Sequence, residues 1–256
     1  LQSVSKSFTS ALVGIAIARG EIKGVREKVL DFFPAMKDIA NLDERKADMR
    51  LEDILTMRTG TDYHENGAGS PHEQLNRLLK GWDKFYLDRP MIRAPGEGFR
   101  YDSGGVILIS SMLKNRIGMH ALEYAKKFLF KPMGIEKLFW AQNFEGQTHC
   151  GGGLALTARD TARFGLLYLQ NGRWGKEQVV PEAWVRVSFH TPASSRRYTL
   201  LYPYPHTRPA LSKNATIGLP TPFLNVHVSP SRMPYLRRFI TQTRPSGAIW
   251  TVRASS

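Results

Sequence analysis

The segment that decides the fold is Ser3-Val4-Ser5-Lys6-Ser7-Phe8-Thr9, at the start of the chain. A lysine three residues after a serine lies on the same helix face, so the Lys6 side chain can reach the Ser3 hydroxyl. That hydroxyl is a weak nucleophile until a neighbouring group takes its proton. A helix is expected here, ending at Gly20, because apolar residues recur at helical spacing: Phe8, Ala11, Leu12, Ile15 and Ala16. Ser3 is therefore expected at a helix N-terminus, whose dipole and free N–H groups favour negative charge.

The same spacing recurs in Ser111-Met112-Leu113-Lys114, so the pattern alone has low specificity. This second copy follows an apolar run at residues 106–109 and lies late in an expected helix, with no helix N-terminus behind its serine. We interpret it as a solvated helix turn. For the first copy, the alternative interpretation is a simple N-cap serine beside a surface lysine.

A third candidate residue lies farther along, in A-P-G-E-G-F-R-Y-D-S at residues 94–103. Tyr101 in this segment can relay a proton or give it to a leaving group, provided that its site adjusts its pKa. A serine, a lysine one helical turn later and a tyrosine from elsewhere can together form an acyl-transfer site.

Further segments follow in a fixed order: L-E-D-I-L-T-M-R-T-G (51–60), G-G-G-L-A-L-T-A-R-D-T-A-R-F-G-L-L-Y-L-Q-N-G (151–172) and V-V-P-E-A-W-V (179–185). With the serine and tyrosine segments, they resemble the serine β-lactamase and penicillin-binding-protein-like hydrolases. The most similar branch is the class C β-lactamase-related group, which includes esterases and 6-aminohexanoate-dimer hydrolases. The resemblance implies Ser3 as nucleophile, Lys6 as its base and Tyr101 as second proton-transfer residue. Ser103 replaces the asparagine common at its position and is implied to bind substrate.

The resemblance also implies elements that this sequence does not supply in the expected places. Family members carry sheet strands before the nucleophile, whereas here two residues precede Ser3. They also carry a Lys-Thr-Gly or His-x-Gly strand near the end. Arg58-Thr59-Gly60 precedes the tyrosine, which is the wrong order, and His149-Cys150-Gly151 is interpreted as a loop before a helix. We therefore expect an α/β fold of the serine β-lactamase/DD-peptidase type, a helical cluster against an antiparallel sheet, with the sheet incomplete.

Composition changes abruptly in the last quarter of the chain. All 22 acidic residues lie at or before Glu182, whereas 10 of the 36 basic residues and 9 of the 15 prolines follow it. The net charge of +14 therefore arises mainly from this region and says little about partners. We expect a hydrolase domain at residues 1–193 and an atypical basic, Pro-rich tail at 194–256.

Three interpretations of the tail remain open. A nucleic-acid-binding arm suits the charge, but the arginines are scattered without a patch or a known module, so no nucleic-acid partner is expected. A disordered tail conflicts with its many large apolar residues. A departure from the family's reading frame near residues 193–198 explains the loss of acidic residues and of motifs together, and it is the interpretation we favour.

Other patterns set limits on partners and compartment. The lone Cys150 excludes an intramolecular disulfide, and no apolar run is long enough to span a membrane. No signal peptide is visible, so the compartment stays open, with an extracytoplasmic site suggested by the resemblance. His64-Glu65 and His72-Glu73 are interpreted as a loop and a solvated helix face rather than metal ligands. No metal and no cofactor are expected.

Capping and turn residues predict the remaining elements. Helices are expected over 71–80, 104–115, 120–129, 158–170 and 181–187, and one short strand over 137–140. The predicted function is hydrolysis of small esters, amides or lactams through an acyl-enzyme. D-alanyl peptidase or β-lactamase activity is the alternative within this class, and a non-catalytic remnant or penicillin-binding-type module is the alternative outside it.

Overall fold

The computed structural model describes residues 1–189. The chain divides into two compact units, Leu1–Arg208 and Pro209–Ser256, and the second lies outside the described residues. The predicted boundary at 193 and the interpretations of the tail at 194–256 also fall outside them. The helices are α1 (Ser5–Ala18), η1 (Val29–Phe32), α2 (Glu44–Asp48), α3 (Leu51–Leu55), α4 (Pro71–Arg77), α5 (Trp82–Leu87), α6 (Ser103–Ile117), α7 (Ala121–Ala125), η2 (Lys126–Phe130), α8 (Ala158–Leu169) and α9 (Glu182–Ser188).

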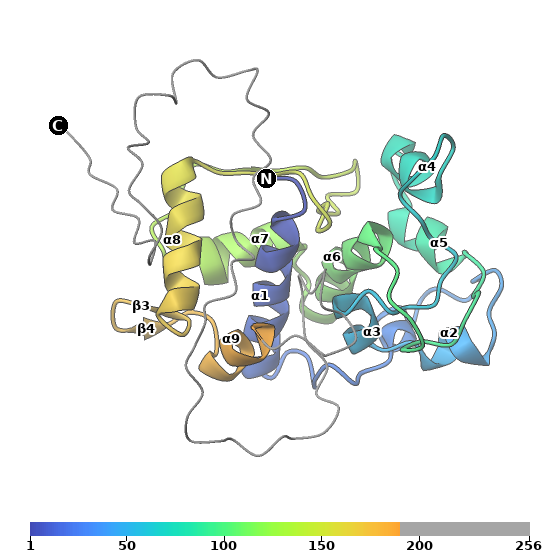
Figure 1. The fold of residues 1–256 in the computed structure, drawn as a ribbon, viewed down its shortest axis with the longest axis horizontal. Helices are drawn as coiled ribbons and strands as arrows, with labels where there is room; N and C mark the ends of the chain where they lie inside the picture. Colours follow the sequence, from blue (N-terminus) through green and yellow to red (C-terminus); the bar gives the residue numbers. More distant parts are fainter. Residues whose placement is uncertain (190–256) are drawn as a thin grey trace, which may run out of the picture. The chain divides into compact units, whose positions relative to one another are not determined.

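Helix α1 is the centre of the described unit. Its residues from Ser5 to Ala16 are buried, apart from a half-buried Ser7, which is typical of a helix enclosed on all sides. Figure 1 shows α6, α7, α8 and α9 around it. The ring of Phe8 stacks on Phe164 of α8 with the centroids 3.7 Å apart. The helix that carries the serine–lysine pair is thus fixed in place by the hydrophobic core.

Helix α6 is the second long buried helix, and its two ends follow capping rules. The Asp102 side chain accepts a hydrogen bond from the N–H of Gly105 at 2.8 Å, which caps the first turn. Gly118, in the left-handed conformation at φ 84°, ends the helix. Tyr101 immediately precedes this cap, so the start of α6 determines where the tyrosine lies.

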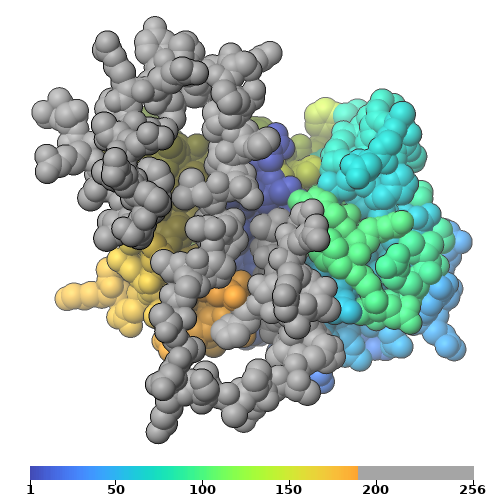
Figure 2. All heavy atoms as spheres, in the orientation of Figure 1, coloured from blue at the N-terminus to red at the C-terminus, as the bar shows by residue number. Residues whose placement is uncertain are grey.

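The described residues contain two small antiparallel sheets, each of two strands. Strand β1 (Phe139–Trp140) pairs with β2 (Leu154–Ala155), and β3 (Arg173–Trp174) pairs with β4 (Glu177–Gln178). The expectation of a helix-rich α/β fold with an incomplete sheet is confirmed for this part of the chain. In Figure 2 the residues coloured cyan to green, which include α4 and α5, form one continuous part of the surface.

Most predicted helices are present, with small changes at their ends. The predicted helix over 120–129 is split: α7 runs to Ala125 and continues as the wider π-turn of η2. The interpretation of Ser111 as part of a solvated turn is wrong, because this serine lies in α6 with 6% of its surface exposed. Helix α6 packs against α1, α5 and α7, so other elements cover most of its surface. Across residues 1–189, none of the helices has both the length and the apolar character that a bilayer crossing requires.

Candidate active site

Ser3 lies in the turn that leads into α1. The N–H of Lys6 donates to the Ser3 carbonyl at 3.0 Å, so this turn continues directly into the helix. The Ser5 hydroxyl donates to the carbonyls of Leu1 and Gln2, each at 2.8 Å, and accepts from the N–H of Leu154 at 3.3 Å. The turn is therefore held against β2 as well as against its own helix.

The Ser3 hydroxyl lies between the two proton-transfer groups that the sequence predicts. Lys6 Nζ donates to Ser3 Oγ at 3.1 Å, and the Tyr101 hydroxyl donates to the same oxygen at 2.5 Å. Tyr101 comes from a segment almost one hundred residues away in sequence. The fold thus brings together the three residues predicted as catalytic.

Lys6 is fully buried, with 0% of its surface exposed. Its Nζ also donates to the carbonyl of Gly151 at 2.5 Å and lies 4.9 Å from the centroid of the Tyr101 ring. Burial lowers the pKa of Lys6 to about 8, because the charged form loses its hydration; the charges of Glu65 and Asp102 partly offset this effect. A lysine with a pKa near 8 is available as a neutral proton acceptor at mildly alkaline pH.

The Tyr101 phenol stays protonated at neutral pH. Burial raises its pKa, the hydrogen bond to Ser3 lowers it, and the charge of Glu65 raises it. A protonated phenol beside Ser3 Oγ can give a proton to a leaving group or pass one along.

Buried hydrogen bonds to Asp102 hold the segment that carries Tyr101. One oxygen of this carboxylate accepts from Gly105, and the other accepts from Thr59 Oγ1 at 3.0 Å and from the Tyr86 hydroxyl. Burial raises the pKa of Asp102 to about 6, and these hydrogen bonds limit the rise. Thr59 belongs to the Arg58-Thr59-Gly60 segment, so in this structure that segment supports the start of α6.

Ser103, predicted to bind substrate, is the first residue of α6 and is 2% exposed. Its N–H donates to Glu65 Oε1 at 2.8 Å. A β-carbon at Gly151 would lie 2.9 Å from Ser103 Cβ, so only glycine fits against this serine. The contact between Ser103 and Gly151 keeps the carbonyl that accepts from Lys6 beside the start of α6.

Two residues of the site were not identified from the sequence. Gly151 was assigned to a loop before a helix, yet its carbonyl is a partner of Lys6. Glu65 was also assigned to a loop, yet its carboxylate receives the first N–H of α6. The triple glycine at 151–153 was a signal of close backbone approach, whereas no local pattern marked Glu65.

His72 and His149 fill structural positions. His72 lies on α4, where its Nδ1 is 2.9 Å from the Tyr63 hydroxyl and its Nε2 is 3.0 Å from Asn76 Nδ2. Burial lowers the pKa of His149 to about 4, so this imidazole is neutral at physiological pH. Within residues 1–189, no group of three or more His, Cys, Asp or Glu side chains is arranged to hold a metal ion.

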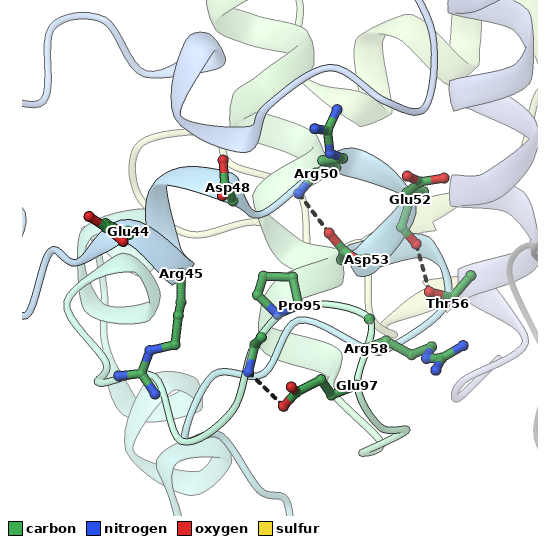
Figure 3. A pocket seen from close by; sticks show the side chains of 12 residues that line it. Glu44, Arg45, Asp48, Arg50, Glu52, Asp53, Thr56, Arg58, Pro95 and Glu97 are labelled. Atoms are coloured by element: carbon green, nitrogen blue, oxygen red, sulfur yellow. Dashed lines mark hydrogen bonds between the residues drawn. The ribbon is translucent and has the colours of Figure 1, made fainter.

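A separate cavity of about 600 Å³ opens beside α2 and α3. Figure 3 shows eight charged side chains around it, among them Arg58 and the buried Asp53, whose carboxylate accepts from the N–H of Arg50 at 2.8 Å. The only hydroxyl in its lining belongs to Thr56 and donates to the Glu52 carbonyl at 2.7 Å. This cavity therefore offers no nucleophile beside a base, and its lining includes none of Ser3, Lys6 and Tyr101.

Solved structures with the same fold are known. A protein from Bacillus anthracis described as a 6-aminohexanoate-dimer hydrolase shares 19% sequence identity with this chain at a TM-score of 0.64, over 76% of this chain and 53% of its own. An octameric penicillin-binding protein homologue from Pyrococcus abyssi shares 18% identity at a TM-score of 0.57, over 75% of this chain and 48% of its own. A D-stereospecific amidohydrolase from Streptomyces sp. shares 13% identity at a TM-score of 0.59, over 78% of this chain and 67% of its own. The chain thus spans about half the length of the first two.

The sequence model of the beta-lactamase family matches residues 1–206, most of the chain. The structural similarities above agree with this assignment at the level of the fold. The chain belongs to the beta-lactamase family.

Proposed function

We propose that this chain is a serine hydrolase that acts on small esters, amides or lactams through an acyl-enzyme on Ser3. The observation that carries the proposal is the position of Ser3 Oγ, which accepts hydrogen bonds from both Lys6 Nζ at 3.1 Å and Tyr101 at 2.5 Å. A nucleophile within hydrogen-bond reach of a base, with a third group beside it, is the arrangement that covalent catalysis requires.

In the acylation step, Ser3 Oγ forms a bond to the substrate carbonyl carbon while its proton moves to neutral Lys6 Nζ. The carbonyl oxygen takes up the negative charge of the tetrahedral intermediate. When the intermediate collapses, the bond to the leaving oxygen or nitrogen breaks, and Tyr101 gives that atom its proton. The proton on Lys6 then restores the Tyr101 phenol, because Lys6 Nζ and the Tyr101 hydroxyl both reach the same oxygen, Ser3 Oγ.

In the deacylation step, water attacks the Ser3 ester, and its proton passes to Lys6. The bond between Ser3 Oγ and the acyl carbon breaks, and Ser3 recovers its proton. For the oxyanion of both steps we propose the N–H of Ser3 and the N-terminal end of α1 as stabilising groups. Loss of one such donor reduces the rate on the order of 10² to 10³-fold in well-studied hydrolases.

We propose that this chain hydrolyses esters and amides in preference to lactams. Ser103 stands where asparagine is common in the family, and this variant is associated with esterase-like and peptidase-like members. The printed descriptions of a hydrolase of an aminohexanoate dimer and of an amidohydrolase among the structurally similar proteins are compatible with that order. A non-catalytic or penicillin-binding-type module is the second candidate. The printed description of a penicillin-binding protein homologue among the structurally similar proteins is compatible with it.

The test is labelling of the full chain with a fluorophosphonate or penicillin probe, followed by mass spectrometry of peptides. We expect the label on Ser3, and we expect Ser3→Ala to abolish it. The matched control is Ser111→Ala, which alters the second serine–lysine pattern and is expected to leave labelling unchanged. A label on Ser111, or a label that survives in Ser3→Ala, contradicts the assignment of the site.

Turnover distinguishes the activities. We expect hydrolysis of a p-nitrophenyl ester to exceed that of nitrocefin, both lost in Ser3→Ala. Fast nitrocefin hydrolysis with an inert ester contradicts the order of substrates. Stable penicillin labelling at Ser3 without turnover of either substrate supports the binding module instead.

A further inference from the structure

Glu65 is a charged residue of the site that the mechanism above does not use. It lies in the loop between α3 and α4, and its Oε1 accepts the N–H of Ser103 at 2.8 Å. Ser103 in turn lies against Gly151, whose carbonyl accepts from Lys6 at 2.5 Å, and Tyr101 is two residues before Ser103. The Glu65 carboxylate is therefore linked to Lys6 through Ser103 and Gly151, and to Tyr101 through the backbone that leads into α6.

The Glu65 carboxylate has no ion pair with any Lys, Arg or His among residues 1–189, and its second oxygen accepts no hydrogen bond from this part of the chain. Glu27, a partly buried carboxylate elsewhere in the chain, does have such a partner in Arg116. Glu65 thus carries a charge that the described protein leaves uncompensated except by Lys6.

Lys6 compensates Glu65 only while it is protonated. In the neutral form that accepts a proton from Ser3, Lys6 no longer offsets the negative charge of this carboxylate. The other nearby carboxylate, Asp102, accepts hydrogen bonds from Gly105, Thr59 and Tyr86. The reactive form of the site therefore has a surplus of negative charge, which attracts a cation and repels an anion.

We propose that Glu65 binds a cationic group of the substrate, so that the preferred esters or amides carry an ammonium or quaternary ammonium substituent near the scissile carbonyl. This inference rests on the proposed function, because it needs Ser3 to be acylated. The free Oε2 of Glu65 is the atom expected to face the cation, while Oε1 stays on the N–H of Ser103.

The test uses three p-nitrophenyl esters whose acyl chains have the same length and end in trimethylammonium, tert-butyl or carboxylate. The first two groups have the same shape, so their comparison isolates charge. Acylation is measured in two ways, as the release of p-nitrophenol and as the increase in the intact mass of the full chain. The mass measurement does not require turnover. We expect the cationic ester to acylate Ser3 faster than the neutral one, and the anionic ester to be slowest.

Glu65→Gln keeps an oxygen that can accept from Ser103 but removes the charge. We expect it to reduce the ratio of cationic to neutral acylation rates on the order of tenfold, with the neutral ester changed far less. The matched control is Glu177→Gln, which removes one exposed negative charge from β4, and it is expected to leave the ratio unchanged. A purely structural role for Glu65 predicts instead an equal change with all three esters.

The outcomes separate the two proposals. If Ser3→Ala abolishes acylation by all three esters but Glu65→Gln leaves the cationic-to-neutral ratio as in the wild type, the role of Glu65 is refuted and the serine mechanism stands. If no ester acylates Ser3 in the wild-type chain, both proposals fall.

Discussion

Lys6 is the residue whose chemistry depends most on its surroundings. An exposed lysine is protonated up to about pH 10 and cannot act as a base at neutral pH. Here burial against Gly151 and Tyr101 lowers its pKa to about 8. The negative charge of Glu65 opposes this change, so the two side chains together determine the pH at which Ser3 becomes reactive.

The rate of Ser3 acylation is predicted to rise through a midpoint near pH 8. Below this pH Lys6 carries its proton and cannot take another, and above it the neutral amine predominates. The measurement is kcat/KM for a neutral p-nitrophenyl ester between pH 6 and about pH 10, corrected for spontaneous hydrolysis. Glu65→Gln is expected to move the midpoint to lower pH, because the carboxylate raises the pKa of Lys6.

The control for this profile is Lys6→Arg, since a guanidinium stays protonated throughout the range. We expect this variant to have little activity and no rise near pH 8. A wild-type profile that is flat between pH 7 and pH 9 contradicts the assignment of Lys6 as the base, and a midpoint unmoved in Glu65→Gln contradicts the effect of Glu65 on the pKa of Lys6.

At the scale of elements, two aspartates cap helices in very different surroundings. Asp43 caps α2 at the surface, where its side chain accepts from the N–H of Lys46 at 2.9 Å. Asp102 caps α6 in the interior and also receives the hydroxyls of Thr59 and Tyr86. An N-cap is worth about 1 kcal/mol, whereas each buried donor that loses its partner costs about 1–3 kcal/mol.

Asp102→Ala is therefore predicted to reduce the free energy of unfolding by about 3 kcal/mol or more, and Asp43→Ala by about 1 kcal/mol. Both variants replace aspartate with alanine and remove one N-cap. The difference between their losses of unfolding free energy therefore measures the cost of leaving the Thr59 and Tyr86 hydroxyls without Asp102. Urea unfolding followed by circular dichroism provides the comparison. Equal losses in the two variants would show that Thr59 and Tyr86 find other partners.

At the scale of the whole described unit, its last helix, α9, packs against its first, α1. Trp184 of α9 lies over Gly14 of α1, and its Nε1 donates to Ser10 Oγ at 3.3 Å. A β-carbon at Gly14 would lie 2.4 Å from Trp184 Cγ, which is far inside van der Waals contact. Gly14 is needed because it lets the indole ring reach the helix backbone.

Gly14→Ala is predicted to destabilise the protein by about 1–3 kcal/mol, because the added methyl overpacks the contact with Trp184. The matched control is Gly165→Ala in α8, where nothing lies within 4 Å of the added carbon. There the higher helix propensity of alanine is expected to stabilise by up to about 1 kcal/mol. Thermal unfolding of both variants checks the opposite signs, and a Trp184→Ala background should remove the penalty at Gly14. A stabilising Gly14→Ala would refute the contact.

Local patterns in the sequence determined the helices and indicated the groups that we propose to react. The caps Asp102 and Thr157, the glycine at 118 and the apolar spacing after Lys6 each act within one or two helical turns, so they can be read without knowing the fold. The spacing of Ser3 and Lys6, and the resemblance that added Tyr101, identified the three side chains that meet at Ser3 Oγ.

Tertiary structure alone decided the chemical state of these groups and their other partners. Segments far apart in sequence meet in one desolvated site. Their contacts lower the pKa of Lys6, supply its hydrogen bond to Gly151 and place Glu65 beside Ser103. The burial of Ser111 has the same origin, because neighbours from other elements cover its face of α6. Burial and electrostatic coupling depend on which segments come together in space. The spacing of residues along the chain does not predict these contacts.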